Sequence, residues 1–313
     1  MSLNVRNYTN KEALLFPARI GDYLPENHLA LVIDDVVDSL DLSCLYAKVS
    51  SVGNPSYHPK MMLKVLFYGY ATLAFSSRKI AKKLDTDIAF IFLSGMQKPD
   101  FRTISDFRKN NVKELPEIFV QIVKLCKNLG LVGLGHISID STITKANASR
   151  EATYDREKLN LEEQATLKKI KELLDAAQHI DNEEDIKFGA SLRGDEIPKE
   201  LHSHEKRLQK IKEAKQKLEE ESLKQINLTD PDAVFQGKLH QPKKPGYRAQ
   251  VAVDEKEQII IASDVVNKST DTESLLPLLE QTADNIPEIA TKESIVLTAD
   301  SAYSSMQNLK SLQ

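Results

Sequence analysis

Hydrophobic spacing divides this chain into two differently patterned parts. Between about residues 20 and 130, apolar residues recur at intervals of three and four, which places them on one face of an α-helix. The first such run comprises Leu29, Val32, Ile33, Val36, Val37 and Leu40. From Tyr247 onward apolar residues alternate with polar ones, as is typical of half-buried β-strands. The pattern predicts a helical N-terminal domain, residues 1–130, followed by a sheet-containing domain, residues 131–313.

Further helices of the first domain carry recognisable start and stop signals. Pro59 occupies a favourable first helical position. The small or apolar residues that follow it at helical spacing are Met62, Val65, Leu66, Gly69 and Leu73. A short helix is predicted from Ser77 to Leu84, and Thr103 with Asp106 resembles a capping box that starts another. A last helix is predicted to end at Gly130.

The stretch from about residue 155 to 226 is predicted to form two charged helices. Their apolar residues at helical spacing are Leu167, Ile170, Leu174 and Ala177, then Leu201, Leu208, Ile211 and Leu218. Residues 181–198 contain two glycines and a proline, so they are predicted to connect the helices. Narrow apolar seams among Lys and Glu favour an antiparallel hairpin inserted into the second domain. A solvated structural arm is the favoured interpretation, and DNA clamping or dimerisation is the alternative.

Strand patterns lie on both sides of this insertion. One strand is predicted at 137–140, and two more, at 247–253 and 258–266, are joined by the polar turn 254–257. A helix at 272–281 and a buried strand at 295–297 follow. The predicted architecture is α+β, with a helical N-terminal domain and an α/β domain interrupted by a helical hairpin.

Composition narrows the class of protein. At 313 residues, with 41% hydrophobic and 28% charged residues, the chain is globular and long enough for about two domains. A net charge of −4 gives no overall basic surface, so nucleic-acid binding would depend on a local patch. Cys44 and Cys126 lack metal-ligand spacing and suit a reducing compartment. The polar N-terminus and the short apolar runs predict a soluble, cytoplasmic protein that makes no membrane contact.

Two aspartates at predicted strand ends are the candidate chemistry. Asp140 ends the first strand, and Asp300 lies just past the fourth. If those strands are parallel neighbours, their C-terminal ends meet at one edge of the sheet, where sites of α/β domains usually form. Carboxylates suit Mg²⁺ or Mn²⁺, and two such ions can activate a nucleophile and stabilise the leaving oxygen in phosphoryl transfer. For each aspartate separately, a turn or capping role is the competing interpretation.

Short segments across most of the chain carry a resemblance to a known family. In the first domain these segments are Asp22–Leu29, Tyr57–Lys64, Phe75–Ile80 and Asp100–Arg108. In the second they are Ile139–Thr142 with Lys145–Ala148, Thr229–Ala233, Gly246–Asp254 and Thr298–Tyr303. In this order the segments resemble the DDE-type transposases of bacterial insertion sequences. The resemblance implies DNA transposition by metal-dependent strand cleavage and transfer, on an RNase H-like catalytic fold.

The resemblance further implies that Asp140 and Asp300 are the first two acids of a catalytic triad that binds two Mg²⁺ or Mn²⁺ ions. The third acid, normally a glutamate on a helix after a fifth strand, has no counterpart, because none of the 13 residues after Asp300 is Asp or Glu. We therefore expect an incomplete RNase H-like domain in a truncated transposase that is inactive unless a third acid is supplied.

Basic residues near the resembling segments are candidate contacts to double-stranded DNA, the transposon terminal repeats in this interpretation. The candidates are Arg78, Lys79, Arg102, Arg108, Lys109, Lys243, Lys244 and Arg248. Those of the first domain flank a candidate helix-turn-helix formed around Ile80, Leu84 and residues 103–108. A solvated surface is the competing interpretation for such charges.

Two alternative functions remain open from the sequence. One is a non-catalytic DNA-binding protein that regulates or inhibits a full-length transposase by mixed assembly. In this interpretation and in the enzymatic one, the protein partner would be a second copy of this chain, in a homo-oligomer, or a full-length transposase. The other is a purely structural coiled-coil protein, which leaves the two strand-end aspartates unexplained.

Overall fold

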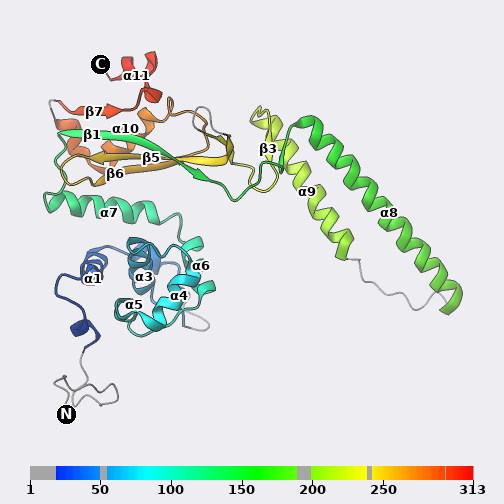
Figure 1. The fold of residues 1–313 in the computed structure, drawn as a ribbon, viewed down its shortest axis with the longest axis horizontal. Helices are drawn as coiled ribbons and strands as arrows, with labels where there is room; N and C mark the ends of the chain where they lie inside the picture. The colour runs from blue at the N-terminus through cyan, green and yellow to red at the C-terminus, as the bar shows by residue number, and fades with distance from the viewer. Residues whose placement is uncertain (1–18, 50–54, 189–198, 238–241, 293, 313) are drawn as a thin grey trace, which may run out of the picture. The chain divides into compact units, whose positions relative to one another are not determined.

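The computed structural model describes residues 19–49, 55–188, 199–237, 242–292 and 294–312 (Figure 1). Backbone contacts divide the chain into two compact units, Met1–Gly130 and Leu131–Gln313. The first is helical and the second combines a mixed sheet with helices. None of the described helices is long and apolar enough to cross a membrane.

The first unit consists of short helices around a central one, α3 (Pro59–Ala71). The other elements are η1 (Ile20–Tyr23), α1 (Leu29–Ser39), α2 (Ser43–Tyr46), α4 (Ser77–Thr86), α5 (Ile88–Leu93), α6 (Phe101–Asn110) and α7 (Leu115–Asn128). Helix α3 is buried along most of its length, and Met62 and Val65 lie in the same core cluster as Ile80 of α4 and Ile104 of α6. At Gly69 an added Cβ would lie 2.9 Å from Ile80 Cδ1, so the glycine permits α3 and α4 to pack closely.

One local prediction for this unit is wrong and another is confirmed only in part. Helix α6 begins at Phe101 and is capped by Asp100, whose carboxylate accepts a bond of 2.7 Å from Thr103 N, so Thr103 is not the cap. In α1 the buried residues are Ala30 and Val37, whereas Leu29 and Val32 are 44% and 51% exposed. Val37 of the predicted face is buried and Ile33 and Leu40 pack against the core, so periodicity found the α1 helix and part of its buried face.

The second unit is organised by a five-stranded sheet (Figure 1). Its strands are β1 (His136–Lys145), β4 (Val234–Gln236), β5 (Lys244–Asp254), β6 (Ile260–Val266) and β7 (Val296–Ala299). The long strand β5 is antiparallel to β1 on one side and to β4 and β6 on the other. Among the described strands, only β1 and β7 are parallel, and only β1 pairs with β7.

Helix α10 (Leu275–Asn285) packs on this sheet through buried Leu275 and Leu278, and Asn285 Nδ2 donates to Ile261 O at 2.8 Å. It begins three residues later than predicted, because the chain turns at Asp271, whose carbonyl accepts a bond from Ser274 N. The short elements η2 (Pro287–Thr291), η3 (Ser301–Tyr303) and α11 (Met306–Ser311) complete this region.

The insertion is a helical hairpin of α8 (Arg156–Phe188) and α9 (Lys199–Glu220), with the two-stranded pair β2 (Thr153–Tyr154) and β3 (Ile226–Asn227) at its base (Figure 1). Its apolar core cluster comprises Leu159, Ile211, Ala214, Leu218 and Ile226. Interhelical ion pairs join Arg207 to Glu162 at 2.7 Å and Lys215 to Glu163.

The predicted seam of α8 is wrong in phase. Leu167 and Leu174 are 46% and 50% exposed, and the neighbouring Thr166 is buried instead. Ala177 belongs to a stretch whose side chains lie outside the described residues. The predicted connection at 181–198 is shorter than expected, because α8 continues to Phe188; residues 189–198 lie outside the described residues.

Candidate active site

The parallel pairing of β1 and β7 brings Asp140 and Asp300 to the same level of the sheet. The register pairs Ile137 with Leu297 and Ile139 with Ala299. Continuing both strands by one residue sets Asp140 beside Asp300, on adjacent chains that lie about 4.8 Å apart in a sheet. Two residues 160 positions apart in sequence are thereby made neighbours.

Both carboxylates belong to the more open face of the sheet. Successive side chains of a strand alternate between faces, so the buried Ile137 and Ile139 assign Asp140 to the opposite face. Asp300 has an extended backbone, φ −63° and ψ 154°, and continues the alternation of β7. Asp140 and Asp300 are both exposed.

Each aspartate is held locally through one oxygen. Asp140 Oδ1 accepts a bond of 2.7 Å from Ser141 N, and Asp300 Oδ1 accepts a bond of 3.1 Å from the Ser301 hydroxyl. No described residue donates to Oδ2 of either carboxylate. Two oriented, solvent-accessible carboxylate oxygens at one strand edge fit a hard divalent cation that retains several waters.

The chain after Asp300 is anchored to the sheet by Tyr303. Its ring is 2% exposed, and its hydroxyl donates to Gln250 Oε1 of β5. Its backbone N–H donates to Asp300 O at 3.0 Å, and its carbonyl accepts from Asn308 Nδ2 at 2.7 Å. Asn308 Nδ2 also donates to Thr272 O at 2.8 Å. These contacts fix the position at which Asp300 leaves β7.

Tyr303 belongs to a buried polar network beneath the aspartates. Gln250 Nε2 donates to Asp271 Oδ1 at 2.8 Å, and Arg248 Nη1 donates to Asp271 Oδ2. Arg248 Nη1 also donates to Ser141 Oγ at 3.3 Å, so the network reaches the residue after Asp140. Burial, together with the charges of Asp271 and Asp140, raises the pKa of Tyr303 to about 12, which keeps the hydroxyl protonated as a donor.

This network gives Arg248 an internal role that its sequence pattern did not indicate. Besides Asp271 and Ser141, its guanidinium donates to Gln236 Oε1 at 3.1 Å and to Ser269 O at 3.1 Å. The Arg248 side chain is 14% exposed. Its donors are therefore directed within the domain, although we had predicted a contact to DNA.

The described residues supply few candidate metal ligands around Asp140 and Asp300. Among the parts of the chain that the structure describes, no group of three His, Cys, Asp or Glu residues is placed to hold a metal ion. Asp140 and Asp300 fit as two carboxylate ligands of Mg²⁺ or Mn²⁺ at a site that needs further oxygen ligands.

The basic candidates of the first unit gather on α4 and α6. Arg78 and Arg102 approach the ring of Phe101, with guanidinium carbons 4.1 and 5.7 Å from its centroid. Lys79 and Lys109 are exposed. Arg108 is half-buried and donates to Tyr70 Oη at 3.3 Å and to Phe75 O at 3.4 Å.

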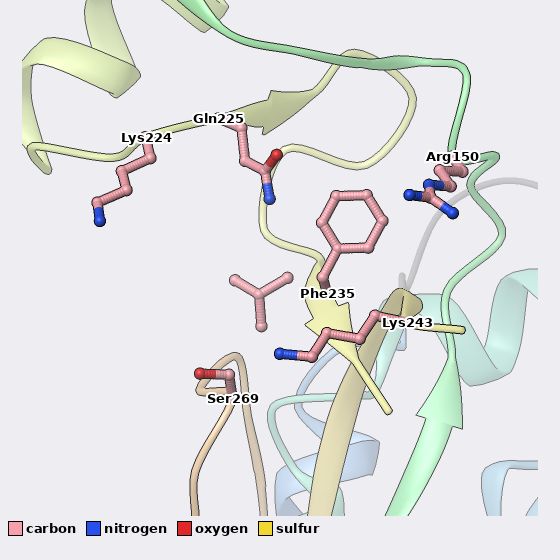
Figure 2. Close-up of a pocket in the computed structure, with 7 residues that line it drawn as sticks. Arg150, Lys224, Gln225, Phe235, Lys243 and Ser269 are labelled. Atoms are coloured by element: carbon pink, nitrogen blue, oxygen red, sulfur yellow. The ribbon is translucent and has the colours of Figure 1, made fainter. Parts of the chain in front are cut away.

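The basic candidates of the second unit separate by environment. Lys243 and Lys244 are exposed, unlike Arg248. Lys243 lines a pocket together with Arg150 and Lys224, neither of which we had singled out (Figure 2). Their only sequence signal is a positive charge beside a short strand, which is too common to be informative.

Comparison with known protein families gives two matches. Residues 18–110 match the family described as Transposase domain (DUF772), and residues 197–313 match the family described as Transposase DDE domain. Asp300 lies inside the second match and Asp140 lies before it, so the pairing of Asp140 with Asp300 rests on the sheet register. No curated protein and no solved structure matches the chain significantly.

Proposed function

Since this chain belongs to the DDE-type transposases of insertion sequences, we propose that it acts in DNA transposition by cleaving and joining strands at Asp140 and Asp300. The observation that carries the proposal is the parallel register of β1 and β7, which brings these two carboxylates together. The order β6–β5–β1–β7, in which only β1 and β7 are parallel, supports the RNase H-like fold that the family resemblance implies.

The two aspartates would hold Mg²⁺ or Mn²⁺, which supplies positive charge against the phosphate and lowers the pKa of a nucleophilic water or hydroxyl. Ser141 N and the Ser301 hydroxyl orient the two carboxylates by engaging one oxygen of each. Tyr303 acts as a positioning residue, because it ties the exit of β7 to Gln250 without being exposed to substrate.

We propose that full activity requires a third carboxylate from outside the described residues or from another transposase chain. Within the described part of the chain, Asp140 and Asp300 have no third acidic partner in a metal-binding group. Purified chain alone should therefore bind Mn²⁺ weakly and nick DNA slowly.

We propose that the DNA is held by exposed cations on both units. In the first unit Arg78, Lys79, Arg102 and Lys109 supply these charges on α4 and α6. In the second, Lys243 and Lys244 do so where β5 begins. The partly engaged Arg108 of the first unit adds to its local positive potential, whereas the charge of Arg248 is neutralised by its ion pair with Asp271. Phosphate contacts of this kind position a duplex without reading its sequence.

A second function is favoured by the two-carboxylate ligand set. A chain that binds terminal repeats but cuts them poorly would regulate or inhibit a full-length transposase by mixed assembly. In that case DNA affinity would be retained in variants of Asp140 and Asp300, and cleavage would be absent from all of them.

A nicking assay on a terminal-repeat duplex with Mn²⁺ separates these functions. The matched control is Asp264→Asn, because Asp264 is an exposed strand residue whose Oδ1 accepts from Val265 N at 2.7 Å, as Asp140 does from Ser141. Catalysis at the proposed site predicts nicking that Asp140→Asn and Asp300→Asn abolish and Asp264→Asn preserves. Nicking that persists in Asp140→Asn overturns the assignment, and binding without nicking favours the regulatory function.

A further inference from the structure

A pocket of about 630 Å³ lies where the base of the hairpin meets the sheet (Figure 2). It is lined by Arg150, Lys224, Gln225, Val234, Phe235, Lys243 and Ser269. Its volume is within the range of about 300–1,000 Å³ that is typical of small-ligand sites. Five separate chain segments contribute to it, because residues before β2, before β3, in β4, before β5 and after β6 converge there.

The pocket is strongly positive in a chain whose net charge is −4. Arg150, Lys224 and Lys243 line it, and no Asp or Glu does. All three are exposed, and none of them forms an ion pair with a carboxylate of the described residues. Their charges are therefore available to an anionic ligand.

An aromatic ring occupies the centre of this positive surface. Figure 2 shows Phe235 between Gln225 and Lys243, with Arg150 to one side. Phe235 is half-buried on β4, opposite Pro245 of β5. The next residue, Gln236, is buried on the other face and bonds to Arg248 and to Lys268 O. Figure 2 shows the Phe235 ring on the pocket side of β4.

Cations around a flat aromatic ring match the chemistry of an unpaired nucleotide. Its base would stack on Phe235, its phosphates would contact Arg150, Lys224 and Lys243, and the polar ends of Gln225 and Ser269 would meet the base edges. An intact duplex cannot use this arrangement, because its base faces are covered by stacking on their neighbours.

We propose that this pocket binds an unpaired nucleotide of the DNA that the protein acts on. The proposal rests on the proposed function for the identity of the nucleic acid. Strand β1 links the two sites: Asp140 and Lys145 are five residues apart, and Lys145 pairs with Gly246 close to the pocket. Five strand residues span about 17 Å, which is on the order of five base-pair steps of duplex. The pocketed nucleotide would therefore lie several steps from the cut.

The chain contains no tryptophan, so Phe235→Trp creates a single fluorescent reporter in the pocket. The probes are a single-stranded oligonucleotide, a blunt duplex and the same duplex with three unpaired bases, all in EDTA so that metal plays no part. We expect the single strand and the duplex with unpaired bases to quench the indole fluorescence of the Phe235→Trp variant, and the blunt duplex to leave it nearly unchanged. Leu167→Trp, on the exposed side of α8, is the control reporter.

Affinity measurements by anisotropy complete the test. Phe235→Leu should weaken single-strand binding roughly ten-fold through lost stacking, and Phe235→Tyr should restore it. Lys243→Gln should reduce the slope of log affinity against log salt by about 0.7, whereas Lys171→Gln, an exposed charge on α8, should reduce it less. Equal single-strand affinity of the wild type and Phe235→Leu would overturn the proposal, as would equal quenching by the blunt duplex.

These results are independent of the metal site. If the chain fails every nicking assay but single-stranded DNA quenches the Phe235→Trp fluorescence as expected, the nucleotide pocket stands and the catalytic function is refuted. If the chain nicks DNA normally but the Phe235 variants show neither quenching nor weaker single-strand binding, the catalytic function stands and the pocket is refuted.

Discussion

The ion pair between Arg248 and Asp271 offers the sharpest test of the buried network. Their side chains are 14% and 6% exposed, and the remaining polar atoms of Asp271 are engaged by Gln250. Replacing Asp271 with Ala would leave the Arg248 charge buried without its counter-ion, and breaking a pair in this way costs about 3–5 kcal/mol. We expect Asp271→Ala to lower the free energy of unfolding of the second unit by that amount.

The double variant Arg248→Met/Asp271→Leu separates an unpaired charge from lost packing. If the cost arises from the uncompensated charge, replacing both partners with apolar residues should recover most of the lost stability. Urea denaturation followed by circular dichroism gives the unfolding free energies, and the transition of the first unit serves as an internal reference.

The matched control is the exposed pair between Lys268 and Glu273, whose side chains are 48% and 68% exposed. Surface pairs of this kind contribute about 0–1 kcal/mol, so Glu273→Ala should change stability little. An Asp271→Ala variant as stable as Glu273→Ala would refute the account of the network, and so would a double variant no more stable than Asp271→Ala.

Three further predictions follow from single contacts. Tyr303→Phe should destabilise the second unit by about 1–3 kcal/mol at neutral pH, because Gln250 Oε1 loses its buried donor. Burial raises the folded-state pKa of Tyr303 from 10.0 to about 12. The contribution of the Tyr303 hydroxyl to stability is therefore complete below pH 10 and is lost as the pH rises from 10 to 12. The stability difference between the wild type and Tyr303→Phe should accordingly narrow in melts at alkaline pH. Leu159→Ala should cost about 2–5 kcal/mol in hairpin stability by opening a cavity. Leu167→Ala, at an exposed site of the same helix, should be nearly neutral in thermal melts. Equal destabilisation by the two variants would contradict the burial of Leu159 and the exposure of Leu167. Asp100→Ala should lower the melting temperature of the first unit, and Asp106→Ala should not. The bond from Thr103 N lowers the pKa of Asp100 below 3.8. The difference in melting temperature between the two variants should therefore be present above pH 3.8 and disappear as the pH falls below it.

Sequence periodicity was sufficient to predict the order of the main elements. The hairpin of β5 and β6, the helix that follows them and the strand before Asp300 all have local patterns, because alternation and helical spacing depend on near neighbours. The same locality explains the errors. The phase of α8 is decided by α9, which buries Leu159 and Thr166 and leaves Leu167 exposed. The α6 cap was misplaced by three residues, because both Asp100 and Thr103 are acceptable capping residues.

The sequence predicted the candidate site only as far as the parallel pairing of the two strands that lead to Asp140 and Asp300. Two strand-end aspartates indicated parallel neighbours, and β1 and β7 are paired in that way. The buried partners were not predictable, because Arg248 and Asp271 are 23 residues apart and nothing in the sequence marks either as internal. A basic residue beside a strand has the same sequence signal whether it faces DNA or a buried carboxylate. The pocket around Phe235 is harder still to predict, since five segments build it and the hairpin separates Arg150 from the other four.

Binding of Mn²⁺, followed by electron paramagnetic resonance, tests most directly whether Asp140 and Asp300 share a metal ion. Titrations would compare the wild type with Asp140→Asn, Asp300→Asn, the double variant and the Asp264→Asn control. A shared site predicts that either single change removes most of the binding, that the double variant adds little, and that Asp264→Asn binds as the wild type does. Unchanged binding in Asp140→Asn, or independent and additive losses from the two single changes, would contradict it.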